Sequence, residues 1–545
     1  MKLELPNIPA DERSPLVESL LALLRVQQDR IQQLEASVQQ LRDEIALLKG
    51  QKPRPDIQPS LLETRLPKPA APEGSKRPGS AKRPKTAELH IHQEVPLHPK
   101  DLPVGATFRG YETYVVQELV IHNANTRYLR ARYDLPGGGS VVAPFPAGVL
   151  PIEGGHFGPN LIAYILDQYH QAQVTEPLLL AQLWEYGIDI SAGQLHRILT
   201  ENKEPFHQEK DEILAAALTE SSYLGTDDTG ARHRGQNGYC TALGNDLFAY
   251  FESTDRKSRL NFLQVLQGGG QRDYAINEIT RAYWERQKLA AALVDQLTQG
   301  PSAFVGEPAW QARLAALAIT DERHVRIATE GALLGGLVAR GVAADLVVLS
   351  DGAPQFDVFV HASCWIHAER PLVKLVPHND QHRTAITQVR SQVWELYQDL
   401  KTYRAQPDEA QQSTLAARFD TLVEQRTGYP SIDGVLKEMR AHRADLLRVL
   451  ERPEVPLHNN ALESDIREFV KRRKISGGTR NEAGRHCRDT FASLKKTCRK
   501  LGVCFWDYLQ DRVRGLGIIP RLAELIRQKA RSATAPPGEA VPANG

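Results

Sequence analysis

The chain has 545 residues, of which 41% are hydrophobic and 24% are charged, as is ordinary for soluble globular proteins. This length predicts about three or four folded units, and the composition excludes a wholly disordered, collagen-like or membrane-embedded chain. The chain contains 67 Lys and Arg against 66 Asp and Glu. Net charge therefore indicates neither an acidic nor a basic partner, and any nucleic-acid site must follow from where the charges cluster.

Cysteine usage and the apolar stretches indicate a soluble protein of a reducing compartment. Five cysteines occur without a Cys-x-x-Cys pair, which argues against a disulfide scaffold or a Cys-rich zinc site. The polar, acidic segment 1–13 is not typical of a signal peptide. Arg340 and Asp345 interrupt the longest apolar stretch, 332–349, which predicts a buried helix, a glycine turn and a strand. We expect no membrane segment and a cytoplasmic location.

Residues 14–50 show the heptad pattern of a coiled coil. Apolar residues alternate at spacings of three and four, with Gln and Glu at the flanking positions. Mostly β-branched residues at one core position and Leu at the other favour a parallel dimer, in which Gln27 would fix the register. The alternative is an amphipathic helix that packs on its own domain. The core positions are Val17, Leu24, Ile31, Val38 and Ile45, and Leu20, Gln27, Leu34, Leu41 and Leu48.

Residues 51–87 are predicted to form a basic, proline-rich linker. Eight prolines, nine Lys or Arg and three acids lie between positions 51 and 86, which predicts an extended chain. The linker is either a solvated tether or an arm that contacts phosphates without recognising sequence.

Residues 88–157 show the short alternating runs of a small β-rich module. We predict strands at 114–121, 126–133 and 140–143, with a glycine turn at 137–139. His90, His92 and His98 lie close together without a nearby cysteine. We therefore interpret them as surface histidines and predict no zinc.

Residues 158–215 are predicted to be helical and to resemble a helix-turn-helix. Gly187 ends the first of two short helices, and Ser191 with Gln194 forms a capping-box pattern that begins the second, 192–200. In a DNA-binding unit the second helix enters a groove, so Gln194 and Arg197 are candidate DNA contacts. The alternative is an ordinary helical hairpin that does not contact DNA.

Residues 220–515 follow the element order of a ribonuclease-H-like α/β core. Three strands with hairpin spacing and a short helix precede a buried apolar strand that ends in Ser350-Asp351-Gly352. Helical insertions are predicted at about 272–330 and 382–450, and residues 516–545 are predicted to form a C-terminal helix and a disordered tail. The first three strands are predicted at 222–228, 239–243 and 247–252, and the helix at 258–266.

In such a core the first and fourth strands are neighbours, which brings acidic residues together. Asp227 or Asp228 on the first strand would lie near Asp351 at the end of the fourth. Two close carboxylates repel each other unless a divalent cation lies between them, and oxygen ligands favour Mg²⁺ or Mn²⁺ over zinc. Glu463, predicted on a helix that also carries Asn460 on the same face, would complete a two-metal site. Taken singly, each acid is more typical of a solvated or salt-bridged carboxylate.

A basic segment follows Glu463. The stretch 467–500 holds twelve Lys or Arg and three acids, and Gly477-Gly478 follows its densest part. A carboxylate beside such a cluster is typical of a metal-dependent enzyme that acts on a polyanion. The candidate DNA contacts here are Arg467, Lys471, Arg472, Arg473 and Lys474.

Five motifs occur in an order that is similar to that of a known family. They are Asp227-Asp228-Thr229-Gly230, Ser350-Asp351-Gly352, the block Cys364-Trp365-Ile366-His367-Ala368-Glu369-Arg370, Asn459-Asn460-Ala461-Leu462-Glu463 with Arg467, and Arg473-Lys474 followed by Gly477-Gly478 and Ser493-Leu494-Lys495-Lys496-Thr497. In these motifs the chain resembles the insertion-sequence-66 (IS66) group of DDE transposases, the large transposase subunit of that bacterial element. The resemblance covers most of the chain.

This resemblance implies that Asp227, Asp351 and Glu463 are the catalytic and metal-binding carboxylates. The family usually has Glu where this chain has Asp228, so the first acid is either Asp227 or Asp228. The family commonly carries a Cys-rich zinc module after the coiled coil, whereas residues 88–157 contain no cysteine, and no zinc is carried over. That difference and the long spacing between the first two acids mark a divergent member.

The resemblance implies a DNA transposase that cuts at the element's ends and joins them to target DNA with Mg²⁺ or Mn²⁺. Its implied partners are DNA, a second copy bound through the coiled coil, and accessory proteins where the element encodes them. It would act in the bacterial cytoplasm, on the nucleoid. The alternatives are a catalytically silent DNA-binding relic or regulator, and another ribonuclease-H-like nuclease such as a junction resolvase.

Overall fold

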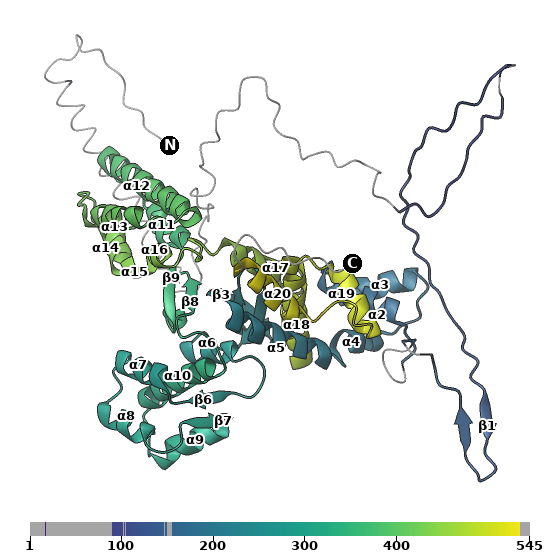
Figure 1. Cartoon of the computed structure of the whole chain (residues 1–545), viewed down its shortest axis with the longest axis horizontal. Helices are drawn as coiled ribbons and strands as arrows, with labels where there is room; N and C mark the ends of the chain where they lie inside the picture. The colour runs from purple at the N-terminus through teal and green to yellow at the C-terminus, as the bar shows by residue number, and fades with distance from the viewer. Residues whose placement is uncertain are drawn as a thin grey trace.

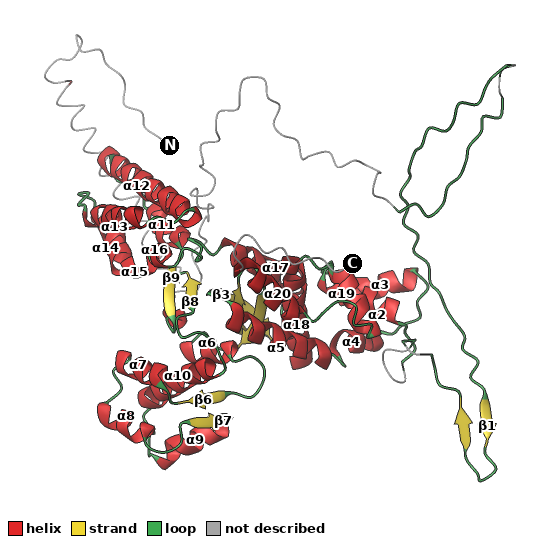
Figure 2. Cartoon of the chain, in the orientation of Figure 1, coloured by secondary structure: helices red, strands yellow, loops and turns green. Residues whose placement is uncertain are grey.

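The computed structural model describes residues 17, 90–101, 103, 105–146, 148–149 and 155–534. The predicted coiled coil (14–50), apart from residue 17, lies outside the described residues, as do the linker (51–87) and the tail from residue 535. Many helices surround a main sheet that mixes parallel and antiparallel pairs, so the chain is of mixed α/β class (Figure 1, Figure 2). None of the described helices has the length and apolar character of a membrane span.

The segment 90–146 contains less β-structure than its sequence predicts. Its strands are β1 (Arg132–Asp134) and β2 (Ser140–Val142), which pair as an antiparallel hairpin. The strand predicted at 114–121 does not form, and Tyr114 within it is exposed. A stable strand needs a partner and a packed face. This segment instead extends outward in long loops (Figure 1), although Asn123 Nδ2 donates to the Gly187 backbone oxygen (3.2 Å).

Between residue 155 and the main sheet the chain forms four helices, whose ends follow signals in the sequence. Gly187 has a φ of 73°, which lets the chain reverse between the second and third of them. The Ser191 side chain accepts a hydrogen bond from the Gln194 backbone, and the Gln194 side chain accepts one from the Ser191 backbone, which confirms the predicted capping box. The helices are α2 (Pro159–His170), α3 (Glu176–Glu185), α4 (Ala192–Thr200) and α5 (Glu204–Glu220).

The main sheet has five strands in the order β5-β4-β3-β8-β9. Strands β3, β4 and β5 are antiparallel, as expected of strands joined by short turns, whereas β3, β8 and β9 pair in parallel. All four residues of β8 are buried, as expected of a central strand. The strands are β3 (Tyr223–His233), β4 (Gln236–Gly244), β5 (Ala249–Thr254), β8 (Val347–Ser350) and β9 (Val360–Ser363).

Helix α18 (Glu482–Leu501) closes the edge of the sheet at β5. Side-chain oxygens one helical turn apart accept hydrogen bonds from the backbone N–H groups of alternate β5 residues. An uncovered edge strand would offer these groups to another chain, so the Ser-Leu-x-x-Thr motif of α18 has a structural role. The pairs are Asp489 with Ser253 (2.8 Å), Ser493 with Phe251 (2.9 Å) and Thr497 with Ala249 (3.2 Å).

The first insertion lies between β5 and β8. It is mainly helical, as predicted, but it also contains a short antiparallel pair, β6 (Asp273–Ala275) and β7 (Ala303–Val305). Gly336 of the last helix lies against the backbone of Asp273, where a Cβ would not fit. The helices are α6 (Arg259–Leu266), α7 (Glu278–Arg286), α8 (Ala291–Thr298), α9 (Glu307–Ala316) and α10 (Glu322–Ala339).

The second insertion follows β9 and has a hydrophobic core of its own, in which Trp365, Tyr397 and Phe419 are buried. Figure 2 shows that it is built of helices. They are α11 (Trp365–Lys374), α12 (Asp380–Ala405), α13 (Glu409–Glu424), α14 (Pro430–Ala441), α15 (Arg443–Leu446) and α16 (Arg448–Glu451). The short helix η2 (Pro354–Phe356) joins β8 to β9, and α17 (Asn460–Ser476), α19 (Phe505–Arg514) and α20 (Leu522–Thr534) complete the described elements.

Candidate active site

Two aspartates stand at corresponding positions of neighbouring parallel strands. The ladder pairs Gly225 of β3 with Leu349 of β8, and two residues further along each strand are Asp227 and Asp351. Asp227 lies within β3 and is half-buried, whereas Asp351 directly follows β8 and is exposed. Asp351 Oδ1 accepts a hydrogen bond from the Ala353 backbone N–H (3.0 Å). The first and second predicted acids therefore lie at the same end of this strand pair.

Asp228 belongs to the opposite face of β3, because side chains alternate along a strand. Thr241 Oγ1 donates to one of its carboxylate oxygens (2.6 Å) and Gln355 Nε2 to the other (3.0 Å). Lys257 Nζ lies 3.9 Å from the second oxygen, and the Asp228 side chain is only 4% exposed. Protein donors therefore occupy both oxygens of Asp228.

Glu463 stands in the first turn of α17, and packing holds this helix against β3, β4 and β5. Leu462 and Phe469 of α17 are buried in a cluster with apolar residues of the sheet. The Phe469 ring stacks on Phe251, with 5.7 Å between ring centroids. The sequence predicts a helix at this position, and the amphipathic packing of α17 determines where Glu463 lies.

Asn459, just before α17, fixes the start of the helix to β3. Its Nδ2 donates to the backbone oxygen of Thr226 (3.0 Å), one residue from Asp227. Asn459 Oδ1 lies so close to Gly225 that a Cβ would not fit at that position. Because Asn459 is the N-cap residue of α17, this anchor holds the first turn, with Glu463, near Asp227.

The charges of the other two acids act on Asp227. The pKa of Asp227 is raised to about 7, chiefly by burial. A hydrogen bond from the Asp228 backbone N–H (2.7 Å) opposes this rise, and the charges of Asp351, Asp228 and Glu463 add to it. Among the described residues, none donates a hydrogen bond to the buried Oε1 of Glu463. Negative charge therefore accumulates at this point without sufficient compensation, which a divalent cation would relieve.

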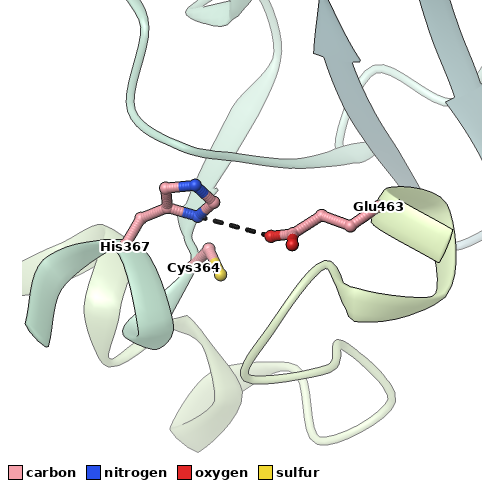
Figure 3. Close-up of side chains that lie close together, drawn as sticks. All are labelled: Cys364, His367 and Glu463. Atoms are coloured by element: carbon pink, nitrogen blue, oxygen red, sulfur yellow. Dashed lines mark ion pairs between the residues drawn. The ribbon is translucent and has the colours of Figure 1, made fainter. Parts of the chain in front are cut away.

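Two further side chains, Cys364 and His367, lie against Glu463 (Figure 3). Cys364 is the N-cap residue of α11, and His367 stands in its first turn. His367 Nδ1 lies 3.8 Å from Glu463 Oε1, and one potential ligand atom from each of the three residues lies within 4.8 Å of the others. Burial lowers the pKa of His367, as does Arg370, whereas Glu463 and Asp351 raise it. In the sequence both residues stand out only as parts of the block 364–370, and their Cys-x-x-His spacing at a helix start is the signal that points to this cluster.

Exposed basic side chains continue along α17 beyond Glu463. Arg467, Lys471 and Lys474 are all exposed. Arg467 and Lys471 line an open hollow of about 630 Å³, to which α18 contributes Lys496, Arg499 and Lys500. Asp465 and Glu468 also line this hollow. Exposed cations such as Arg467 and Lys471 are of the kind that attracts phosphates without reading a base sequence.

The two other predicted DNA contacts of this helix, Arg472 and Arg473, are bound by the protein itself. Arg472 Cζ lies 4.0 Å from the centroid of the Tyr169 ring, and its Nη1 donates to the Val174 backbone oxygen (3.4 Å). Arg473 Nη1 donates to the backbone oxygen of Gly230 on β3. Both arginines therefore connect α17 to neighbouring elements.

Part of the positive charge of α18 is neutralised within the protein. Lys495 and Lys496 both pair with Glu468, and Lys500 Nζ lies 2.9 Å from Asp465 Oδ2. Burial alone would raise the pKa of Glu468, but Lys495 and Lys496 lower it to about 2. The segment 467–500 is therefore less positive towards a ligand than its count of basic residues indicates.

The glycine pair after α17 lets the chain return to β3. Gly477 has a φ of 70°, and a Cβ on Gly478 would not fit against the backbone oxygen of Arg232. The Thr479 N–H donates to the Arg232 oxygen (2.9 Å), and the Arg234 N–H donates to the Thr479 oxygen (2.8 Å). This turn fixes the end of the basic helix to the strand that carries the first acid.

Helix α4 offers fewer free polar groups than the helix-turn-helix prediction assigns to it. The Gln194 side chain is engaged in the capping box, whereas Arg197 is exposed. His196 Nδ1 lies 3.3 Å from Glu176 of α3, and His196 Nε2 lies 3.3 Å from Asn481 Nδ2. One side of α4 thus faces other elements of the protein, and Arg197 is the predicted contact that it leaves exposed.

Comparison with known proteins identifies the family. Residues 349–486 match the Transposase IS66 family, and this segment contains Asp351, Glu463 and all of α17. The chain is also 40% identical over 323 residues to the uncharacterized protein y4jO of Sinorhizobium fredii (strain NBRC 101917 / NGR234), an alignment that covers 58% of this chain and 100% of that protein. The chain belongs to the IS66 transposase family. Membership in the IS66 family implies that it binds DNA, and DDE transposases generally use divalent metal ions.

Proposed function

We propose that this IS66-family protein is a DDE transposase that cuts DNA at the element's ends and joins those ends to target DNA. The observation that supports this most directly is the position of Asp227, Asp351 and Glu463. They come from β3, the end of β8 and the start of α17, and both Asp351 and Glu463 raise the pKa of Asp227. The strand order β5-β4-β3-β8-β9, antiparallel and then parallel, supports a ribonuclease-H-like core.

The donor set fits Mg²⁺ or Mn²⁺. Asp227, Asp351 and Glu463 supply only carboxylate oxygens, which these ions prefer. The raised pKa of Asp227 and the buried Oε1 of Glu463, which accepts no hydrogen bond from the described residues, are the properties expected of ligands whose charge a cation compensates. We assign the first ligand to Asp227 rather than Asp228, because Thr241, Gln355 and Lys257 already satisfy Asp228.

The chain's own residues would orient the substrate around these carboxylates. When bound, two metal ions would polarise the attacking oxygen, first of water and then of the freed 3′-hydroxyl, and stabilise the leaving oxygen. Arg467, Lys471 and Lys474 are exposed on the helix that carries Glu463 and would neutralise phosphates close to the cut. Arg197 on α4 would add a contact to DNA, and a coiled coil at 14–50 would hold two copies so that both ends are processed together.

Substituting Asp351 by Asn tests this proposal. We expect Asp351→Asn to abolish Mg²⁺-dependent cleavage of DNA carrying the element's ends, because the amide keeps the size but loses the charge, while DNA binding stays measurable. Asp345→Asn is the matched control, since Asp345 precedes the same strand at its other end and its side chain is 71% exposed. Full cleavage by Asp351→Asn would overturn the assignment.

Two alternatives have their own outcomes. A catalytically silent DNA-binding relic or regulator would bind the element's ends without cutting them in Mg²⁺ or Mn²⁺. Another ribonuclease-H-like nuclease, such as a junction resolvase, would cut DNA but would not produce joined donor–target molecules. Sequencing the products of a reaction that contains both DNAs separates the three functions.

A further inference from the structure

Cys364, His367 and Glu463 form a mixed cluster beside the three carboxylates. Within the part of the chain that the structure describes, it is the one group of at least three His, Cys, Asp or Glu residues whose ligand atoms lie within 4.8 Å of one another. Cys364 is 1% exposed, and the side chains of His367 and Glu463 are 23% and 24% exposed. His367 Nδ1 and Glu463 Oε1 are buried and have no hydrogen-bond partner among the described residues. The cluster therefore combines three donors with an opening to solvent.

The donor atoms differ from those of the carboxylate site in their metal preference. A thiolate, an imidazole and a carboxylate together suit Zn²⁺ and other borderline ions, whereas Mg²⁺ selects oxygen ligands. Three protein ligands and a solvent-facing fourth position are the arrangement that open zinc sites use. Glu463 is common to both donor sets, so one metal would compete with the other for its carboxylate.

We propose that Cys364, His367 and Glu463 bind a zinc-type metal ion that withdraws Glu463 from the carboxylate site and so inhibits the enzyme. The metal site stands on the cluster itself, whereas its inhibitory effect rests on the proposed transposase function. This metal site is distinct from the Cys-rich zinc module expected elsewhere in the family, because its ligands stand at the start of α11 and in the first turn of α17.

The local geometry needs only a small adjustment to hold such an ion. Two ligands of one tetrahedral zinc ion lie roughly 3.5 Å apart, given metal–ligand distances of about 2.0–2.3 Å. The present spacing of up to 4.8 Å must therefore shrink by roughly 1 Å. The backbone N–H of Trp365 donates to the Leu457 backbone oxygen (2.9 Å). This hydrogen bond holds the start of α11 next to the segment that leads into α17. Because the backbone of both ligand-bearing turns is already held in place, rotation of the side chains is enough to shorten the distances between the ligand atoms.

Cobalt titration of the full-length, metal-stripped protein tests the site without any DNA reaction. Co²⁺ replaces zinc and gives an intense thiolate-to-cobalt absorption band when a cysteine is a ligand. We expect the wild type to show this band with one Co²⁺ per chain, and Zn²⁺ to remove it. Cys364→Ser should lose the band, and His367→Ala should weaken Co²⁺ binding at least about 10-fold. Cys504→Ser is the control, because Cys504 is the exposed cysteine and the most accessible site for adventitious binding.

The outcomes decide the proposal separately from the catalytic one. Absence of a thiolate band in the wild type, or its persistence in Cys364→Ser, would overturn the metal site even if the protein cuts DNA. A band that depends on Cys364 in a protein that never cuts DNA would keep the site and overturn the transposase function. If both stand, the Zn²⁺ concentration that halves Mg²⁺-dependent cleavage should rise at least about 10-fold in Cys364→Ser, measured against that variant's own activity. Equal zinc sensitivity would refute the inhibitory role.

Discussion

At the residue scale, Asp227 combines a functional position with an electrostatic cost to folding. Its pKa lies at about 7, above the 3.8 that is ordinary for an aspartate, first because the residue is buried and then because Asp351, Asp228 and Glu463 are near. Between these two pH values the folded protein binds more protons than the unfolded chain. The metal-free protein therefore loses stability as pH rises through this window, and the loss is complete above about pH 7.

Replacing Asp227 by Asn should stabilise the metal-free protein. At pH 8 we expect Asp227→Asn to raise the free energy of unfolding by at most about 4 kcal/mol, a limit that solvent screening reduces. The difference should shrink at pH 5, where wild-type Asp227 is protonated. Urea unfolding at the two pH values in the presence of a chelator measures it, with Asp345→Asn as a control. A lower stability for Asp227→Asn at pH 8 would contradict this account.

Asn459 is a positioning residue, which holds the helix start that carries Glu463. Its side-chain amide joins Thr226 of β3 to the start of α17, and the residue is 6% exposed. We expect Asn459→Ala to cost about 1–3 kcal/mol of stability, because it leaves a buried carbonyl oxygen without its donor. The rate of DNA cleavage should fall by more than the loss of folded protein explains, while DNA binding is retained.

A matched asparagine separates the two effects of Asn459. Asn379 caps α12 through its side chain, in the second insertion. Asn379→Ala should cost about 1 kcal/mol and leave cleavage at the wild-type rate under conditions where the protein is folded. Comparing kcat and melting temperature for both variants tests the prediction. Parallel losses of activity in the two variants would show that Asn459 acts through stability alone.

At the element scale, the turn after α17 depends on glycine at position 478. A Cβ there would collide with the backbone oxygen of Arg232, so Gly478→Ala must displace the pairing of Thr479 with β3. We expect a loss of about 1–3 kcal/mol, as for other overpacked sites. Gly434→Ala is the control, because Gly434 occupies an exposed position of helix α14 with open space around it. Alanine there should be neutral or stabilising by up to about 1 kcal/mol. Equal melting temperatures for Gly478→Ala and the wild type would refute this role of the turn.

At the scale of the whole molecule, the heptads at 14–50 predict that the chain is a dimer. We expect the full-length protein to sediment as a dimer and a variant lacking residues 1–50 to sediment as a monomer. The double substitution of Ile31 and Leu34 by Lys should have the same effect without shortening the chain, because charges at core positions oppose helix pairing. A dimer that survives both changes would place the contact elsewhere.

The local signals in the sequence were sufficient for much of the fold. The buried apolar run before Asp351 predicted a central strand, and the structure has β8 there with the acid directly after it. The Ser191 capping box and the Gly187 break predicted the ends of α3 and α4 for reasons that involve only neighbouring residues. The run at 114–121 failed as a strand because strand formation depends on a partner, which alternation along the chain does not supply.

What the sequence by itself determined is therefore most of the helices, the first four main-sheet strands in chain order and the order of the acidic motifs, since capping, turn formation and periodicity act over a few residues. Only the tertiary structure decided which partners the functional side chains contact. The register of β3 against β4 places Asp228 opposite Thr241, which donates a hydrogen bond to it. Asp227 faces the other side of β3, at the same end of the strand pair as Asp351. Helix packing binds Arg472 and Arg473 within the protein and brings Cys364 and His367 to Glu463. These contacts join residues far apart in the chain, and they depend on packing and register, which no local pattern specifies.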